Sequence, residues 1–416
     1  MRGIGYFRNS KAGCLLREKE NRKMLLSLAL VFLCGMLLGS LLEKLGVPRL
    51  LGMLVTGILL GPFGLDLLDG SILGISGELR QIALIIILAR AGLNLDVEDL
   101  KKVGRPAVLM CFVPACFEIV GMVLLAPALL GLTRLEAAVM GTVVAAVSPA
   151  VIVPRMLKLM EEGYGKERSI PQMIMAGASV DDVFVIVLFT AFAGLEKSGS
   201  LSAFGFLAIP TSIVLGLAGG VFVGLALSVL FEKVHMRDSS KVVLMLSVAF
   251  LLVTLEHSMN GVVGFSGLLA VMAMGVALQR RKYDVARRLS SKFSKLWVGA
   301  EILLFVLVGA TVNVGYAWKA GAMAVVLILG VLIFRIAGVF LCLVKTPLSR
   351  KERVFSAVAY LPKATVQAAI GGLPLSMGLA CGDIVLTVAV LSILITAPLG
   401  AALIDCNYKK LLQKAG

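Results

Sequence analysis

Apolar segments recur along the whole chain, and most are near the length that a helix needs to cross a bilayer, although the second is short and rich in Gly and Pro. Windows of about 20 residues give thirteen such segments in the 416 residues. Hydrophobic residues make up 59% of the chain and the mean hydropathy is +0.98, values that soluble domains do not reach. The sequence therefore predicts an all-α polytopic membrane protein with about 13 transmembrane helices. The thirteen segments are Met24–Leu45, Arg49–Pro62, Gln81–Leu95, Pro106–Leu130, Ala137–Leu157, Met173–Leu195, Phe204–Leu230, Val242–Leu255, Val262–Leu278, Leu296–Val314, Ala320–Val344, Val354–Met377 and Ile384–Ile404.

Positive charge alternates between the connections of these segments. Connections after odd-numbered segments carry 26 Lys and Arg residues, counting the segment edges, and connections after even-numbered segments carry 4. Because cytoplasmic loops are enriched in Lys and Arg, we expect the odd connections and the C-terminus, with a short tail of residues 406–416, to lie in the cytoplasm. Residue 1 then lies outside, although residues 1–23 form a basic tail with seven Lys and Arg. That tail is either an unusual outside segment or a mis-assigned start ahead of Met24.

Two of the segments contain proline near their middle. Pro149 and Pro154 interrupt the fifth segment, and Pro362 interrupts the twelfth, where Lys363 and Gln367 follow the break. Unwound backbone at membrane depth is tolerated only where it is buried in protein or lines a water-filled cavity. Such breaks at matching places in the two halves predict inverted repeats around a site near the midplane.

Few ionisable residues lie deep within the segments. The acids are Glu118, Asp181 and Asp182, and the bases are Arg335 and Lys363. Charges at this depth are costly and normally pair with one another. Three acids against two bases leave one negative charge, which a cation or a proton can neutralise. We expect Glu118 and Arg335 to form a buried pair, which would keep Arg335 from competing for Asp181.

The chain resembles the sodium/proton antiporters of the cation/proton antiporter superfamily, in particular the NHA branch, sodium/hydrogen exchanger subfamily B. The resemblance rests on Val147-Ser-Pro-Ala-Val-Ile-Val-Pro-Arg-Met156, Gly177-Ala-Ser-Val-Asp-Asp182 and Leu361-Pro-Lys-Ala-Thr-Val-Gln-Ala-Ala-Ile-Gly371. Gly92-Leu-Asn-Leu-Asp96 is a weaker match. The order of these motifs, their spacing and the number of apolar segments extend the resemblance over nearly the whole transmembrane region, residues 24–405.

The resemblance implies a fold of two bundles and a role for each aspartate. A core bundle would lie within residues 106–195 and 320–404 and hold two crossed discontinuous helices, with a dimerisation bundle within 24–95 and 204–314. Asp182 would bind the cation and release a proton, with Asp181 as its auxiliary partner. Some members of the family have a lysine where this chain has Arg335, which is effectively never deprotonated and cannot carry the proton.

The same residues suggest a mechanism. Desolvation disfavours the charged form of a carboxyl group, so Asp182 can hold either a proton or a metal ion, here a monovalent cation, and competition for it couples the two fluxes. Ser148 and the carbonyl groups freed at its break supply the hard oxygen donors that Na⁺ or Li⁺ prefers. Lys363 is expected to neutralise the carbonyl-rich helix ends at the crossing, and its alternative is a direct part in ion or proton traffic.

The leading hypothesis is therefore an antiporter that exchanges Na⁺ or Li⁺ for H⁺ by alternating access. Alternatives are a K⁺/H⁺ antiporter, a sodium-coupled symporter for an organic anion, or a channel, although no selectivity-filter repeat is present. Seven scattered Cys and two His form no nucleophile–base set or metal cluster, so we expect neither an enzyme nor a cofactor.

Partners and location follow from the same reasoning. The net charge of +15 is explained by cytoplasmic loops, so we expect no nucleic-acid partner. The basic connection 279–297 is expected to lie against membrane lipids at the inner leaflet. We expect a homodimer in the cell membrane, the inner membrane of a bacterium.

Overall fold

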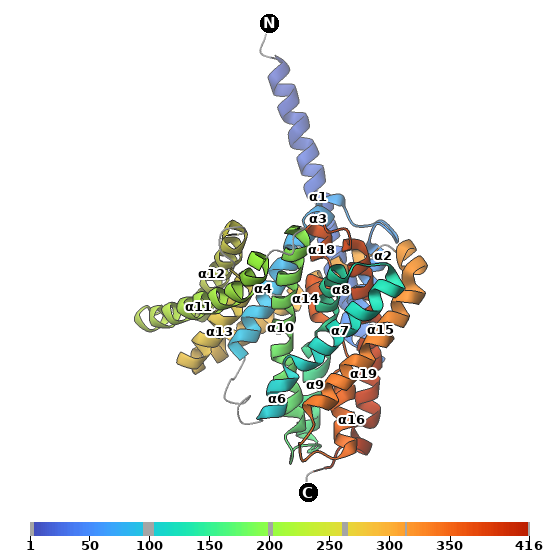
Figure 1. Ribbon diagram of the computed structural model, residues 1–416. Coiled ribbons are helices and arrows are strands. Elements are labelled where there is room, and N and C mark those ends of the chain that lie inside the picture. Colours follow the sequence, from blue (N-terminus) through green and yellow to red (C-terminus); the bar gives the residue numbers. More distant parts are fainter. Residues whose placement is uncertain (1–3, 95–103, 199–202, 260–264, 313, 415–416) are drawn as a thin grey trace.

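The protein is helical throughout the part of the chain that the structure describes. The computed structural model describes residues 4–94, 104–198, 203–259, 265–312 and 314–414 (Figure 1). Within them the β-structure is a single isolated bridge between Tyr164 and Lys414. This agrees with the predicted all-α class.

Each of the thirteen predicted apolar segments contains helix within the described residues. Nine helical stretches in the described residues are by themselves long and apolar enough to span a membrane. The protein is thus a multi-pass membrane protein, and the count of thirteen crossings stays a prediction. The first half contains α1 (Ile4–Lys44), α2 (Arg49–Leu60), α3 (Gly70–Gly74), α4 (Ser76–Asn94), α6 (Arg105–Met110), α7 (Val113–Leu130), α8 (Arg134–Ala145), α9 (Pro149–Glu161) and α10 (Ile170–Ser198). The second half contains α11 (Ala203–Lys233), α12 (Asp238–Met259), α13 (Gly267–Arg281), α14 (Tyr283–Ala310), α15 (Val314–Cys342), α16 (Arg350–Ala359), α17 (Thr365–Ile370), α18 (Leu373–Ser376) and α19 (Gly382–Leu411).

The first helix begins and the last helix ends on opposite sides of the molecule. α1 has 41 residues, about 60 Å of helix, and its N-terminal part projects beyond the other helices at the top of Figure 1. α19 ends at the bottom of the same view. An odd number of crossings gives this arrangement. Residues 4–23 of the predicted basic tail belong to the same long helix as the first span.

The basic connection at residues 279–297 has no separate helix of its own. α13 ends at Arg281 and α14 begins at Tyr283. Most of residues 279–297 therefore continues directly into the tenth apolar segment as one helix.

Contacts between helices fall into two sets. α1, α2, α4, α11, α12, α13 and α14 pack mainly on one another, and α7 packs on α8 and α15, with α16 and α19 beside them. Figure 1 shows α11, α12 and α13 on one side and α15, α16 and α19 on the other. We call the first set the scaffold. The second set, with α6, α9, α10, α17 and α18, we call the core. α4 and α14 both contact α17, so the two sets meet beside a broken helix.

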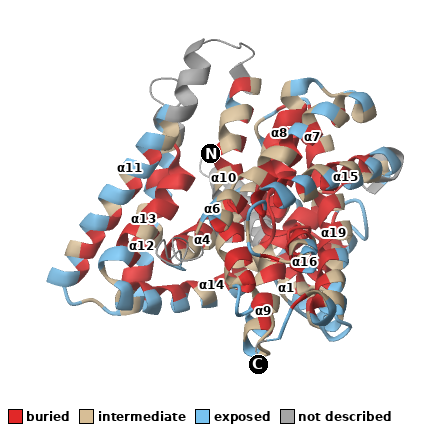
Figure 2. Cartoon of the chain, turned by 60° about the horizontal axis from the view of Figure 1, so that its bottom comes forward, coloured by how far each residue is buried: buried red, intermediate tan, exposed pale blue. Residues whose placement is uncertain are grey.

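Apolar side chains are exposed along the outer helices. Leu217 and Phe222 of α11 and Leu251 of α12 are examples, with Phe222 74% exposed. Figure 2 shows buried residues where the helices meet and exposed residues on the outer side of α11. Since lipid tails are apolar, such a surface suits helices that face a bilayer.

Both predicted helix breaks are present. The fifth segment is interrupted at residues 146–148, between α8 and α9, and Pro149 takes the first position of α9. The twelfth is interrupted at residues 360–364, between α16 and α17. Proline lacks the N–H that would continue the helix and its ring clashes with the preceding turn. α9 lies below α8 in Figure 1, whereas α18 lies above α16, so the two broken helices run in opposite directions.

The fourth segment also contains a break, which we did not expect. α6 ends at Met110 and α7 begins at Val113. The backbone at Phe112 leaves the helical region, with φ −145° and ψ −34°. Pro114 follows two residues later and has no N–H to donate to Met110, which accounts for the interruption.

Candidate functional site

The two broken helices cross where their backbones are unwound. The N–H of Ser148 donates to the carbonyl of Pro362 at 2.8 Å. α8 and α16 both end at this point, and α9 and α17 both begin there. The crossing therefore brings together two C-terminal ends, which carry partial negative charge, and two N-terminal ends, which carry partial positive charge.

Arg335 of α15 donates hydrogen bonds at the C-terminal ends of both α8 and α16. Its guanidinium donates to the carbonyl of Tyr360 at 2.6 Å and to the carbonyl of Ala145. It also forms ion pairs with Glu118 at 2.7 Å and with Asp181 at 3.0 Å, and all three side chains are fully buried. The expected Glu118–Arg335 pair is present. The expectation that this pair would keep Arg335 away from Asp181 is wrong, because the guanidinium has enough N–H donors to reach both acids.

Lys363 completes the same network. Its Nζ lies 2.5 Å from Oε2 of Glu118 and 3.3 Å from the carbonyl of Ala145. The lysine is fully buried, and its own N–H donates to Thr396 of α19 at 2.9 Å. Lys363 therefore contacts a carbonyl at the end of α8, as we expected. It also contacts Glu118, for which we had expected Arg335 as the partner.

Gln367 satisfies the remaining carbonyl groups of the first break. Its Nε2 donates to the carbonyls of Val144 at 2.9 Å and Ala146 at 2.8 Å. Sequence reasoning placed Gln367 beside the break but gave it no partner. Because the side chain belongs to α17, and the carbonyls to the last turn of α8 and the residue that follows it, this amide joins one broken helix to the other.

Asp181 is bound to the crossing through one of its two carboxylate oxygens. Its Oδ2 accepts hydrogen bonds from the N–H of Val147 at 2.9 Å and from Arg335. The Val147 N–H is one of the donors freed just before α9, so the carboxylate occupies the positive end of that helix. These contacts hold one oxygen of the carboxylate; the other, Oδ1, is buried and has no hydrogen-bond partner in the described residues.

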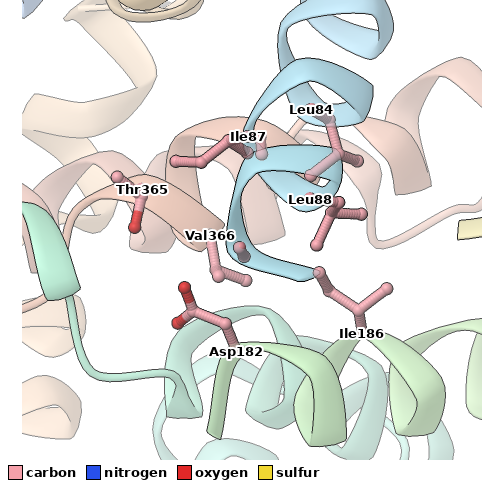
Figure 3. Close-up of a pocket in the computed structure, with 9 residues that line it drawn as sticks. Leu84, Ile87, Leu88, Asp182, Ile186, Thr365 and Val366 are labelled. Carbon is pink, nitrogen blue, oxygen red and sulfur yellow. The ribbon is translucent and has the colours of Figure 1, made fainter. Parts of the chain in front are cut away.

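Asp182, although adjacent in the chain, faces a different environment. In the described residues it takes part in no ion pair, and its buried Oδ1 has no hydrogen-bond partner. Successive helical residues point about 100° apart, so only one of the two acids can face the crossing. Figure 3 shows the Asp182 carboxyl pointing from α10 toward Thr365 and Val366 of α17.

A small cavity of about 20 Å³ lies in front of the Asp182 carboxyl. This is room for about one water molecule. α4 supplies one wall and α10 and α17 supply the other, so the cavity lies where the scaffold meets the core (Figure 3). Its lining residues are Leu84, Ile87, Leu88, Ala91, Asp182, Ile186, Thr365, Val366 and Ala369.

Three hydroxyl groups of residues at the crossing have no hydrogen-bond partner in the described part of the chain. They are Oγ of Ser148, the phenol of Tyr360 and Oγ1 of Thr365, and all three residues are buried. Ser148 occupies the N-cap position of α9, yet its side chain makes no capping bond. Ser148 does not line the cavity at Asp182, whereas Thr365 does. Sequence reasoning named Ser148 and passed over Thr365, although a hydroxyl two residues after Lys363 in the broken segment was a usable signal.

Among the five deep charged residues, the ion pairs in the described part of the chain include every residue except one acid. Glu118 is paired with Arg335 and Lys363, and Asp181 with Arg335. With all five groups ionised the cluster carries one net negative charge, and the acid without an ion pair is Asp182. A proton or a monovalent cation at Asp182 would neutralise the cluster.

The weaker fourth motif is only partly described. Asn94 at the end of α4 accepts a hydrogen bond from Ser290 of α14 at 2.5 Å. Leu95 and Asp96 lie outside the described residues. The described part of the motif thus joins two scaffold helices.

Fold and site together define a multi-pass helical membrane protein with two crossed broken helices around buried charges. Residues 28–404 match the family described as "Sodium/hydrogen exchanger, transmembrane". The chain therefore belongs to the sodium/hydrogen exchanger family.

Relatives and solved structures agree with this assignment. The chain is 34% identical to the human protein sodium/hydrogen exchanger 9B2 over 415 residues, 94% of this chain and 75% of the relative. It is 30% identical to human sodium/hydrogen exchanger 9B1 over 410 residues, 94% of this chain and 78% of the relative. The fold matches the sodium proton antiporter MjNhaP1 from Methanocaldococcus jannaschii with a TM-score of 0.82 and 22% identity, covering 94% of this chain and 99% of that one. At this identity the structural match shows the fold.

Proposed function

We propose that the protein is an antiporter that exchanges Na⁺ or Li⁺ for H⁺, with Asp182 as the group that binds either ion. The observation that carries the proposal is the position of Asp182, an acid without an ion pair beside a cavity. Membership of the sodium/hydrogen exchanger family supports it. So do the names of the relatives, which describe those proteins as sodium/hydrogen exchangers.

Charge balance gives the coupling. When Asp182 loses its proton the buried cluster carries one net negative charge, and a charge at membrane depth is costly. Binding of a monovalent cation or of a proton removes that cost, and one carboxylate cannot bind both. Each ion therefore leaves the site when the other enters, which links the two fluxes.

The residues that line the cavity include oxygen ligands for the cation. The Asp182 carboxylate and the free hydroxyl of Thr365 line the same cavity, and hard oxygen donors suit Na⁺ and Li⁺. Ser148 remains a proposed further ligand, because its hydroxyl is also without a partner in the described residues. The transported cation is a substrate, and we propose no resident cofactor.

Arg335, Lys363 and Glu118 support the site without carrying the ions. Arg335 stays protonated, and its contacts hold Asp181 and both C-terminal ends in place. Lys363 and Glu118 neutralise each other and the end of α8. We propose that these three residues keep the crossing rigid while Asp182 exchanges ions, so the protein works as a transporter and not as an enzyme.

The decisive test is Asp182→Asn in reconstituted liposomes. With an imposed pH gradient and an internal pH dye, the wild-type protein should collapse the gradient when Na⁺ is added, and Asp182→Asn should not. The variant should fold, because its amide is uncharged and keeps the shape of the carboxyl. Sodium-dependent proton flux near the wild-type rate in a folded Asp182→Asn protein would rule out the assignment.

Competition between Na⁺ and H⁺ for Asp182 gives a second prediction for the wild-type protein. Lowering the pH should raise the apparent KM for Na⁺ without lowering the maximal rate. A panel of Na⁺, Li⁺ and K⁺ in the same assay decides between the proposed exchange and K⁺/H⁺ antiport. An organic-anion symporter would need a roomy substrate site, and a cavity of about 20 Å³ argues against it.

We also propose a homodimer with a cytoplasmic C-terminus in the cell membrane. The distribution of Lys and Arg supports the orientation. A protease or antibody directed at the C-terminus should reach it only in opened cells, and mass measurement in detergent should give two chains. The comparisons with human relatives lend no support to the predicted bacterial inner membrane.

A further inference from the structure

Arg80 is a buried cation on the scaffold side of the Asp182 cavity. It belongs to α4, is 8% exposed, and its Nε donates to the carbonyl of Ser76 at 3.1 Å. Leu84, four residues later on the same helix, lines the cavity. Residues four apart lie on the same face of a helix, so Arg80 lies one turn away from the cavity on its lining face.

Gly372 of the core lies directly against this guanidinium. A Cβ placed on Gly372 would be 2.1 Å from Nη1 and 3.2 Å from Nη2 of Arg80. No residue other than glycine fits there without moving the arginine. Gly372 follows α17, and Ala369, three residues earlier, lines the cavity.

The Arg80–Gly372 contact therefore lies at one end of the cavity and joins its two walls. In Figure 1, α3, which directly precedes α4, and α18, whose N-cap is Gly372, both lie toward the top, opposite the C-terminus. Arg80 is near the start of α4, so Arg80 and Gly372 both lie on the side opposite the C-terminus. With the proposed orientation this is the outer side. A cation that moved from there to Asp182 along the interface of α4 and α17 would meet the guanidinium first.

We propose that Arg80 is an electrostatic gate on the outer side of the Asp182 site. In the described conformation it rests on Gly372, fills the seam between scaffold and core, and repels cations. Movement of the core relative to α4 would separate Gly372 from Arg80 and open the route from outside. The outer side is assigned from the proposed topology, and the ions to be repelled follow from the proposed function.

A chemical accessibility assay tests the gate without relying on transport. Ala369→Cys places a thiol on the cavity wall. Intact cells are treated with two membrane-impermeant thiol reagents of similar size, one a positively charged methanethiosulfonate and one an uncharged analogue. Labelling of the peptide that contains residue 369 is followed by mass spectrometry, so the native cysteines do not interfere.

Replacing Arg80 should accelerate labelling by the cationic reagent. We expect Arg80→Gln to raise that rate by about tenfold or more, because like charges repel strongly in a low dielectric, and to raise the rate of the uncharged reagent much less. Arg80→Lys keeps the charge and should stay near the wild-type rate. Ile82→Ala, an exposed and uncharged site on the same helix, serves as the control and should change neither rate.

The outcomes separate this proposal from the proposed function. No acceleration in Arg80→Gln, or equal acceleration of both reagents, overturns the gate whatever the protein transports. If Arg80→Gln does not fold, Arg80→Ala and Gly372→Ala, which should displace the arginine, are read by the same assay. Repeating the labelling in Asp182→Asn shows whether the gate operates in a protein that cannot exchange ions, so a failed Asp182 assignment leaves the result on Arg80 intact.

Discussion

Two adjacent aspartates have different surroundings because a helix turns between them. Asp181 points into the crossing and accepts from Arg335 and Val147, whereas Asp182 points into the cavity beside α4 and α17. The chemistry of the side chain is the same in both, so the difference arises from position alone. Roles for the two residues can therefore be tested by the same substitution.

Asp181→Asn should weaken transport and lower stability. The substitution removes the negative charge that faces Arg335, and losing one member of a buried pair costs about 3–5 kcal/mol, although Arg335 keeps Glu118. We expect a lower melting temperature in detergent and a reduced exchange rate that still exceeds that of Asp182→Asn. A variant with wild-type melting, rate, apparent affinity and voltage response would show that Asp181 is not needed.

At the residue scale, the deep charges could be located from the sequence, but not all of their partners. Depth in an apolar segment predicted Glu118, Asp181, Asp182, Arg335 and Lys363, because burial of a charge demands a reason. Which acid a guanidinium contacts depends on side-chain directions at a break in the backbone, and the sequence does not fix these. For the same reason the free hydroxyl of Thr365 was not predicted.

Broken helices need side chains to replace the hydrogen bonds that they lose. Here Gln367, Arg335 and Lys363 contact the free carbonyls of α8, and Arg335 contacts that of Tyr360 after α16. Proline predicted the breaks at Pro149 and Pro362 because it cannot continue a helix. The break before Pro114 was missed, since many prolines in transmembrane segments only bend the helix.

Lys363→Ala should chiefly damage stability. Its loss leaves the Ala145 carbonyl with one donor fewer and Glu118 with one cation instead of two, at a cost of roughly 3 kcal/mol. Thermal unfolding in detergent measures the effect. Lys351→Ala, an exposed lysine of α16, should leave the melting temperature unchanged. If Lys363→Ala melts like the wild type but does not transport, the lysine belongs to the ion pathway instead.

Glu118 and Arg335 should behave as a coupled pair that joins α7 to α15. Each single change to Gln leaves a charge short of a partner, and Arg335→Gln should cost more because Asp181 also loses its cation. The double variant should cost less than the sum of the two, by about 0.5–3 kcal/mol. Chemical or thermal unfolding of the four proteins gives the coupling. Additive losses would mean that the pair does not form in the protein.

For the whole molecule, alternating access requires that one wall of the cavity stay still while the other moves. α4 is the scaffold wall, and it packs closely against α13. A Cβ on Gly92 would lie 2.3 Å from the carbonyl oxygen of Met272, so the backbones of these helices touch at a glycine. The arrangement of spans into two sets could be anticipated from the family resemblance, but this close approach could not, because many glycines in the chain have open space around them.

Gly92→Ala should therefore push α4 away from α13 and disturb the cavity from the scaffold side. Gly77→Ala is the matched control, because it lies on the same helix with nothing within 4 Å of the added Cβ. Alanine is favoured over glycine in a helix by about 1 kcal/mol, so Gly77→Ala should melt at the same temperature as the wild type or slightly higher. Gly92→Ala gains the same propensity but must displace backbone, so it should melt lower and exchange ions more slowly, even though Asp182 is unchanged. Equal melting temperatures and exchange rates for the two variants would mean that α4 adjusts freely, and the moving wall would then have to include α4 as well as the core.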